Sequence, residues 1–147
     1  IRDNVLHGNS NYSEKNLDQI LINSNCKQFV ERLPDASDTV LSEGGSSLSS
    51  GERQLISIAR AFAGNPDLII LDEATSYIDT ETEIKIQEVL EKLMVNRTSI
   101  IIAHRLSTVK NADRIIVLNK GEIIETGSYS ELMGKEGFFY KLNLIQG

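Results

Sequence analysis

The sequence predicts an α/β domain with a parallel sheet and flanking helices, joined to a helical subdomain. Two short apolar runs, residues 68–71 and 100–103, have the length and composition of buried strands, and the second strand is expected to span residues 99–103. Residues 80–94 lie between them and carry apolar side chains at helical spacing, and strands that alternate with helices indicate a parallel sheet. Because the first part of the chain is mostly helical in pattern, we expect residues 1–64 to form the helical subdomain and residues 65–147 to form the core.

Helical periodicity begins soon after the start of the chain. Residues 16–29 carry an apolar stripe after a helix start at Ser13, and Pro34 breaks the run. The side chains expected to face inward are Leu17, Ile20, Leu21 and Ile22. Residues 42–51 are rich in serine and glycine and are predicted to form a loop.

A strong helix is predicted directly after this loop. Ser49 or Ser50 can cap its N-terminus, and the Gly-Asn-Pro sequence at residues 64–66 ends it. Its apolar face is expected to consist of Leu55, Ile58, Ala59 and Phe62. The helix at residues 80–94 is expected to turn inward Ile86, Val89, Leu90, Leu93 and Met94.

The last third of the chain is expected to consist of short elements. A short helix near residues 107–111 precedes a third strand at 114–118. The Lys-Gly pair at residues 120–121 forms a turn into residues 122–125, which predicts a hairpin. Ser128 caps the first of two final short helices.

Composition limits the functions open to this chain. The formal net charge of −6 argues against binding nucleic acid or an anionic membrane surface through a basic patch. A single cysteine, Cys26, cannot form an internal disulfide, and we expect it to be a buried, inert thiol. No apolar run approaches the ~20 residues that span a bilayer. Because the chain starts at Ile1 without a methionine, we expect that its beginning lies further upstream.

Residues 48–54 form the first pattern that suggests chemistry. Their Leu-Ser-Ser-Gly-Glu-Arg-Gln sequence places a serine-glycine loop directly at a helix start, where backbone N–H groups and the helix dipole attract phosphate. A plain serine N-cap explains the local feature equally simply.

Two acids at the end of a predicted strand form the second pattern. Asp72 and Glu73 follow the apolar run 68–71, at the edge of a parallel sheet where ligands bind. Asp72 is suited to hold Mg²⁺ through water, and Glu73 is suited to orient and deprotonate an attacking water. The alternative is an acidic strand end that caps the following turn.

Two further residues have a functional and a structural interpretation. His104 follows the second strand, where it can hydrogen-bond a γ-phosphate, although a lone histidine is usually structural. Asp79 precedes the helix at residues 80–94 and is a candidate N-cap, which does not exclude a second role across an interface.

Taken in order and by strand placement, these motifs closely resemble those of the ATP-binding-cassette (ABC) ATPase family, over the whole chain. The matching segments are residues 48–54 (signature motif), 68–72 (Walker B), Glu73 (catalytic glutamate), 76–79 (D-loop) and His104 (switch histidine). Three further segments are typical of exporters: residues 1–5 after the Q-loop, 39–44 in the loop that contacts membrane domains, and 101–108. The expected fold is therefore a partial P-loop NTPase fold, and residues 65–147 are the C-terminal part of its RecA-like core.

The resemblance implies a role for each candidate residue. In this family two ATPase domains pair head to tail, and each ATP lies between the Walker motifs of one domain and the signature motif of the other. Asp72 would support Mg²⁺, Glu73 would activate water, His104 would brace the γ-phosphate and Asp79 would reach across the dimer. The nucleotide-binding residues of the signature motif would be Ser49, Ser50, Gly51 and Glu52.

The same resemblance implies cofactors, partners and location. The cofactors are ATP and Mg²⁺, and the partners are a second ABC ATPase domain, identical or different, and the transmembrane domain of an exporter. No nucleic-acid partner is expected. The domain would lie at the cytoplasmic face of the cell membrane.

The sequence departs from the family pattern in two ways. Ser50 stands where the family usually has glycine, and Glu52 where it usually has glutamine. In addition, no G-x-x-x-x-G-K-[ST] loop is present, because Tyr129 replaces the first glycine ahead of Gly134-Lys135. We therefore expect this chain alone to bind ATP weakly, to have negligible turnover and to expose apolar sheet surface.

Two other functions remain open from the sequence. The chain is also compatible with a degenerate, regulatory subunit of a heterodimeric exporter, although the intact Glu73 argues against full degeneracy. A soluble ABC ATPase that works on nucleic acid or ribosomes is a further alternative. The acidic charge and the exporter-like segments 1–5 and 39–44 argue against it.

Overall fold

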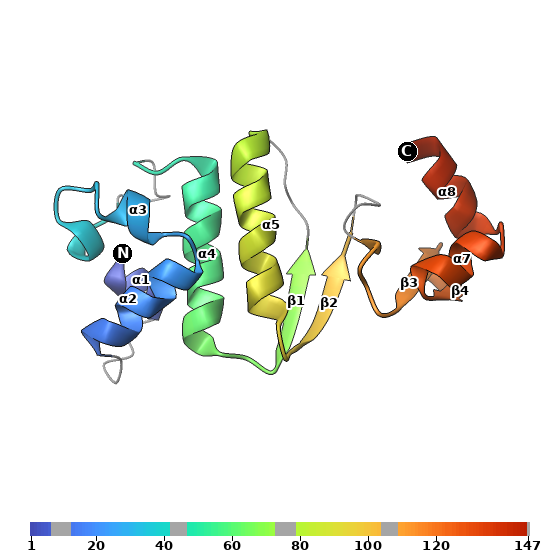
Figure 1. Cartoon of the computed structure of the whole chain (residues 1–147), viewed down its shortest axis with the longest axis horizontal. Coiled ribbons are helices and arrows are strands. Elements are labelled where there is room, and N and C mark those ends of the chain that lie inside the picture. The colour runs from blue at the N-terminus through green and yellow to red at the C-terminus, as the bar shows by residue number, and fades with distance from the viewer. Residues whose placement is uncertain (7–12, 42–46, 73–78, 104–108, 147) are drawn as a thin grey trace. The chain divides into compact units, whose positions relative to one another are not determined.

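The computed structural model describes residues 1–6, 13–41, 47–72, 79–103 and 109–146. The chain forms two compact units, one of residues 1–70 with 74–100 and the other of residues 71–73 with 101–147. The first unit is mostly helical, and the second contains a hairpin and two helices (Figure 1). Among the described residues, no helix is both long and apolar enough to cross a bilayer.

Within the described residues, the first unit begins with four short helical elements, which are followed by the longer helix α4. Its elements before the first strand are α1 (Arg2–Leu6), α2 (Glu14–Asn23), α3 (Lys27–Val30), the 3-10 helix η1 (Ala36–Asp38) and α4 (Ser50–Gly64). Ser13 caps α2 as predicted, and its hydroxyl accepts a hydrogen bond from the backbone N–H of Asn16. The buried side chains of α2 are Leu17, Ile20 and Leu21, which confirms most of the predicted stripe.

The single helix predicted for residues 16–29 is wrong in extent. Helix α2 ends at Asn23, and Asn25 adopts a left-handed conformation with φ of 55°, which stops the helix before α3 begins. Asparagine tolerates this conformation better than most residues, so the break needs no glycine. Ile22 was expected to face inward but is 44% exposed.

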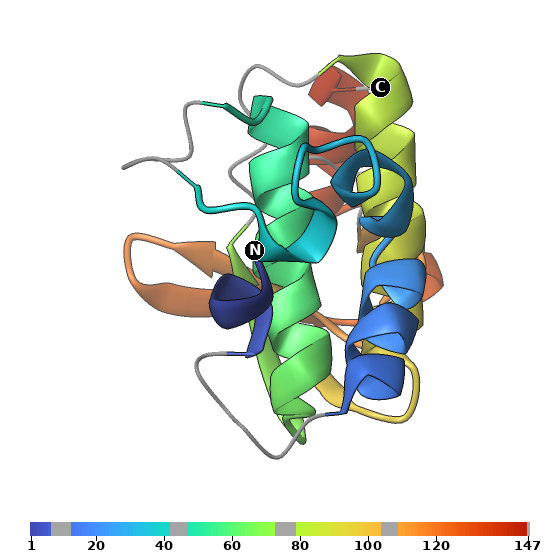
Figure 2. The same ribbon diagram turned by 90° about the vertical axis from the view of Figure 1, so that its left-hand side faces the viewer.

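Among the described elements, helix α4 packs against three other helices of the first unit. It contacts α1 and α2 along one part of its surface and α5 (Thr80–Met94) along another, as Figures 1 and 2 show. Of the predicted apolar face, Leu55, Ile58 and Ala59 are buried and Phe62 is half-buried, and Ile56 and Ala63 are buried in addition. The helix ends at Gly64, and the left-handed residue after it is Asn65, with φ of 43°.

Helices α4 and α5 run side by side in the same direction, so their N-termini lie at the same end (Figures 1 and 2). Gly51, in the first turn of α4, is buried, and a Cβ atom placed on it would overlap the Cγ2 methyl of Thr82 in α5. Glycine is therefore required here by close packing between the two helices. The side chains that α5 buries are Ile86, Val89 and Leu93, in agreement with the predicted face.

Strands β1 (Leu68–Asp72) and β2 (Thr98–Ile102) confirm the two predicted strands and form a two-stranded sheet. Their arrows point the same way in Figure 1, with α5 between them in the chain, as in a β-α-β unit. The prediction that both faces are buried is wrong for this chain: Ile69 is buried, but Leu68 is 52% and Ile70 is 64% exposed. Side chains alternate along a strand, so one apolar face is left open. This confirms the expected exposed apolar surface.

The second unit contains a separate hairpin of β3 (Ile115–Asn119) and β4 (Glu122–Gly127). The antiparallel register runs from Ile115 opposite Gly127 to Asn119 opposite Glu122, with an irregularity after Val117. Lys120 and Gly121 both have positive φ, 49° and 84°, which fits a type I′ turn. The third strand and the hairpin are thus confirmed. Of the helix expected near residues 107–111, residues 107 and 108 lie outside the described residues.

Two helices complete the second unit, α7 (Tyr129–Gly134) and α8 (Phe138–Gln146). As predicted, Ser128 caps α7, and Glu131 completes a capping box. The carboxylate of Glu125 in β4 accepts hydrogen bonds from the backbone N–H groups at the start of α8, and this holds the pKa of Glu125 below its usual value. The core of the unit consists of Ile115, Val117, Leu132 and Phe139.

Cys26 is fully buried, and its burial raises the pKa of its thiol to about 11. A thiol with so high a pKa is almost entirely protonated at neutral pH and reacts poorly. The expectation of a buried cysteine is therefore confirmed, and the raised pKa agrees with an inert thiol.

We predict that Gly51→Ala destabilises the protein by about 1–2 kcal/mol. The overlap of the new methyl group with Thr82 outweighs the gain of up to about 1 kcal/mol in helix propensity. Urea unfolding measures the change. The double variant Gly51→Ala with Thr82→Ser removes the obstructing methyl group and should regain most of the lost stability. A single Gly51→Ala variant as stable as the parent would contradict the packing described here.

Candidate functional site

The N-terminus of α4 carries the predicted signature residues and is closed by a reciprocal pair of hydrogen bonds. The hydroxyl of Ser49 accepts from the backbone N–H of Glu52 at 3.2 Å, and a carboxylate oxygen of Glu52 accepts from the backbone N–H of Ser49 at 2.9 Å. This is a capping box, so the plainer interpretation of Ser49 as an N-cap is confirmed. Ser50, the next residue, is exposed at the same end.

The partial positive charge of the helix dipole at the N-terminus of α4 is already partly balanced by an acidic side chain. The carboxylate of Glu52 lies in the first turn, where the helix dipole favours negative charge. The guanidinium of Arg53 points back to the loop, and its Nη1 donates to the carbonyl of Leu48 at 2.6 Å. Leu48 itself is buried. An anion that approached these amides would therefore meet a helix end that an internal carboxylate already occupies.

Asp79 holds the corresponding position at the start of α5. Its side chain accepts a hydrogen bond from the backbone N–H of Thr82 at 2.9 Å, and this bond holds the pKa of Asp79 below its usual value. The predicted N-cap role is thus confirmed. Because Thr82 packs against Gly51, the capped starts of α4 and α5 lie next to each other.

Asp72 is the last residue of β1, and its side chain is exposed. Mg²⁺ in nucleotide sites commonly takes one or two carboxylates together with phosphate oxygens and water, so a single exposed carboxylate is compatible with this role. Among the described residues, no group of three or more His, Cys, Asp or Glu side chains could hold a metal by itself.

The structure brings together only some of the predicted site residues. Ser49, Gly51, Glu52 and Asp79 belong to the first unit and share one end of the α4–α5 pair, whereas Asp72 belongs to the second unit. The two predicted catalytic residues, Glu73 and His104, lie outside the described residues. Their roles stay predictions.

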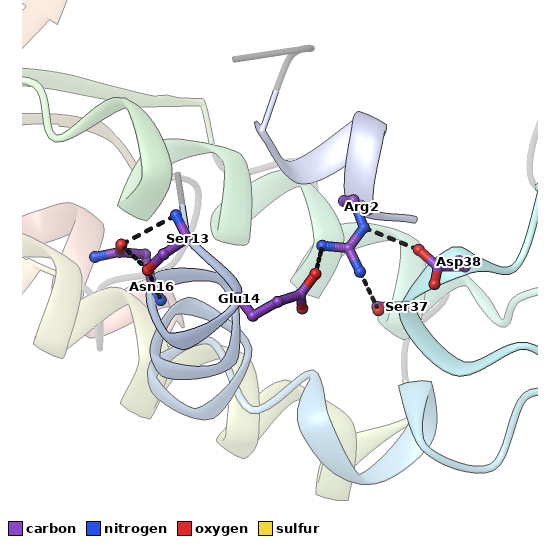
Figure 3. A network of polar contacts seen from close by, with 6 residues as sticks. All are labelled: Arg2, Ser13, Glu14, Asn16, Ser37 and Asp38. Atoms are coloured by element: carbon purple, nitrogen blue, oxygen red, sulfur yellow. Dashed lines mark hydrogen bonds and ion pairs between the residues drawn. The ribbon is translucent and has the colours of Figure 1, made fainter. Parts of the chain in front are cut away.

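One network in the first unit was not anticipated from the sequence. The guanidinium of Arg2 forms an ion pair with Glu14 in α2 and donates to Asp38 in η1 at 2.8 Å and to Ser37 at 3.4 Å (Figure 3). These partners lie 12 to 36 residues away along the chain, so no local spacing pattern indicates them. The network ties α1 to η1, directly before the predicted membrane-contact loop at residues 39–44.

The described part of that loop is exposed. Val40 is 90% exposed, the highest value among the large apolar side chains that the structure describes as exposed. Thr39 and Leu41 flank it, and residues 42–46 lie outside the described residues.

Comparison of the chain with known proteins identifies its family. Residues 2–76, about half of the chain, match the family model described as ABC transporter. The matched segment runs from α1 through the capped start of α4 to β1 and the residues that follow Asp72.

Individual relatives agree with the family match. The chain is 50% identical over 146 residues to the ATP-dependent lipid A-core flippase of Syntrophus aciditrophicus, covering 99% of the chain and 24% of the relative. It is 47% identical over 146 residues to the probable multidrug resistance ABC transporter ATP-binding/permease protein YheH of Bacillus subtilis, covering 99% and 22% respectively. The chain thus spans about a quarter of the length of the curated relatives it matches.

A solved structure shows the same fold. The chain superimposes on a bacterial Atm1-family ABC exporter with ATP bound, with a TM-score of 0.85 and 36% sequence identity, over 99% of this chain and 26% of that one. The predicted partial ABC ATPase fold is confirmed by this match. Together with the family model over half of its length, it establishes that the chain belongs to the ABC transporter family.

Proposed function

We propose that the chain is the C-terminal part of the nucleotide-binding domain of an ABC exporter, which couples ATP binding and hydrolysis to the movement of a substrate across a membrane. The observation that carries this proposal is the likeness, along almost the whole chain, to an exporter solved with ATP bound. The relatives named as a flippase and as a multidrug resistance transporter support the same class of activity. Within the chain, residues 1–64 serve as the helical subdomain and residues 65–147 as part of the ATPase core.

The described residues are suited to distinct parts of this activity. Bound ATP supplies the γ-phosphate, and Mg²⁺ neutralises its charge. Ser49 and Gly51 at the start of α4 contact the phosphate of a nucleotide held mainly by a second domain, and Ser50 and Glu52 border the same contact. Asp72 supports the metal ion, and Asp79 reaches toward the partner domain from the start of α5.

Glu73 and His104 complete the proposed machinery. Glu73 accepts a proton from the attacking water, and His104 hydrogen-bonds the γ-phosphate. Phosphoryl transfer depends mostly on positioning and charge stabilisation. Because the chain has no P-loop sequence of its own, we also propose that it binds ATP weakly and has negligible turnover when isolated.

Two partners follow from this role. The first is a second ABC ATPase domain, of the same or a different chain, which contributes the Walker residues opposite Ser49. The second is the transmembrane domain of the exporter, contacted by residues 39–44. The nucleotide-binding domain then lies at the cytoplasmic face of the membrane.

One observation favours a second candidate function. The carboxylate of Glu52 caps the signature helix at the point where a phosphate would bind. This arrangement would suit a regulatory subunit that contributes a weakened half-site to a heterodimer. The intact Glu73 favours the hydrolytic role, so a variant at that position separates the two.

We predict that Glu73→Gln in the whole protein lowers ATP turnover by about 10²–10⁴-fold, the usual contribution of a positioned general base. The amide of glutamine cannot accept the proton of the attacking water, so turnover falls. It keeps the shape of the side chain, so ATP binding should persist. Steady-state phosphate release measures turnover, and filter retention of labelled ATP measures binding. Unchanged turnover would support the regulatory role and exclude Glu73 as the base.

We predict that Glu52→Gln lowers the KM for ATP by roughly fivefold. Removing one negative charge several ångströms from a triphosphate is worth about 1 kcal/mol in a partly solvated site, and the amide oxygen can still accept the bond from Ser49. The matched control is Glu131→Gln, because Glu131 forms the same capping box with Ser128, at 2.8 Å, in the second unit. The control should leave KM unchanged. An unchanged or raised KM in Glu52→Gln would show that this carboxylate does not oppose the nucleotide.

A further inference from the structure

We propose that Arg2 is a positioning residue: through Asp38 and α1 it fixes the contact segment, residues 39–41, to the signature helix α4, and so determines how the membrane domain is engaged. The inference rests on the proposed function, which identifies the partner of this segment. It adds a role for Arg2, to which none is assigned above, and a chain of contacts that joins the contact segment to the signature helix.

The first step of the route is the three-way contact of Arg2. Its guanidinium pairs with Glu14 in α2, donates from Nε to Asp38 at 2.8 Å and reaches Ser37 from Nη2 at 3.4 Å (Figure 3). The Arg2 side chain is 30% exposed, so it is partly shielded from water. A planar guanidinium can hold several acceptors in fixed directions, whereas the ammonium of a lysine acts as a point charge.

The second step is the anchoring of Thr39, which follows Asp38. The backbone N–H of Thr39 donates to the carbonyl of Ala36 at 3.2 Å, and its hydroxyl accepts from the backbone N–H of Asp35 at 3.2 Å. The terminal ammonium group of Ile1 donates to the carbonyl of Thr39 at 2.7 Å, and where another residue precedes Ile1 the donor is its backbone N–H. Residues 1 and 2 therefore hold both the backbone of Thr39 and the acid that precedes it.

The third step joins α1 to α4. Arg60 of α4 donates from Nε to the carbonyl of Asn4 at 3.0 Å and from Nη2 to its side-chain oxygen at 2.6 Å. Val5 of α1 is fully buried, and α1 packs directly on α4. The short helix α1 is thus held to the signature helix on one side and to the contact segment on the other.

These contacts hold the backbone next to Val40 in place. Its side chain is 90% exposed one residue after the anchored Thr39. A fixed apolar side chain docks with a smaller loss of conformational entropy than a freely moving one, which favours an apolar surface of the membrane domain as its partner. Loss of the Arg2 contacts frees the segment while leaving α4 and its capped end unchanged.

A purely structural role for Arg2 would predict a different outcome. Exposed ion pairs contribute little to stability. If Arg2 served only as such a brace, its removal would shift the melting temperature slightly and leave the contact with the membrane domain unaffected. The contact itself is therefore the quantity to measure.

The test uses the whole protein in vesicles of phosphatidylethanolamine and phosphatidylglycerol. A photo-reactive benzoylphenylalanine replaces Val40, and its crosslinking yield to the membrane domain is measured with and without Mg-ATP, together with basal ATP turnover and melting temperature. In Arg2→Ala we expect the yield to fall about fivefold or more, with basal turnover within about twofold of the parent. Arg2→Lys should recover only part of the yield.

Two further variants make the test specific. Asp38→Asn should lower the yield in the same way, and the double variant with Arg2→Ala should be no worse than Arg2→Ala alone, because the two residues act through one contact. Lys27→Ala is the matched control: it removes exposed ion pairs with Asp18 and Glu31 in the same unit and should not change the yield.

The outcomes separate the inference from the proposed function. An unchanged yield in Arg2→Ala, or an equal loss in Lys27→Ala, overturns the role of Arg2 even if Glu73→Gln abolishes turnover. No crosslink to the membrane domain in the parent also overturns it. By contrast, full turnover in Glu73→Gln counts against the proposed hydrolytic function and leaves the Arg2 contact measurable.

Discussion

The packing of α4 is the constraint on which the first unit depends. One helix supplies the buried face for α1, α2 and α5, and at its N-terminus the contact with α5 is so close that a Cβ atom at residue 51 would overlap the Cγ2 methyl of Thr82. Since the two helices start at the same end and Gly51 packs on Thr82, the caps Ser49 and Asp79 lie at the same end of the helix pair. The proposed nucleotide contact is therefore a consequence of how the core of this unit is assembled.

The same helix end serves two purposes that oppose each other. The exposed N–H groups of a helix start must be satisfied for stability, and Ser49 with Glu52 does this through a capping box. A phosphate that binds there competes with the internal carboxylate. A glutamine at this position would accept the same hydrogen bond without a negative charge. The charge of Glu52 therefore stabilises the helix end in the absence of nucleotide and makes the binding of an anion there less favourable.

Much of the fold could be predicted from the sequence because it depends on local patterns. The apolar runs became β1 and β2, the Lys-Gly pair became the hairpin turn, and the serine caps formed at residues 13, 49 and 128. Features that depend on distant contacts were missed. The Arg2 network joins residues up to 36 positions apart. The stop at Asn25 is local, but it was missed because no glycine or proline marks it. The apolar run 68–71 taken alone indicated a strand buried on both faces, and only the absence of a P-loop sequence predicted that one face would be open.

Amide hydrogen exchange in the whole protein, carrying Glu73→Gln to keep ATP bound, tests most directly whether the start of α4 closes on nucleotide. The account predicts that residues 49–54 gain protection only when Mg-ATP is added, while residues 129–132, which follow an equivalent capping box, exchange at an unchanged rate. If ATP binds and residues 49–54 exchange as fast as before, the capped end of α4 is only a structural helix start and the central claim is wrong.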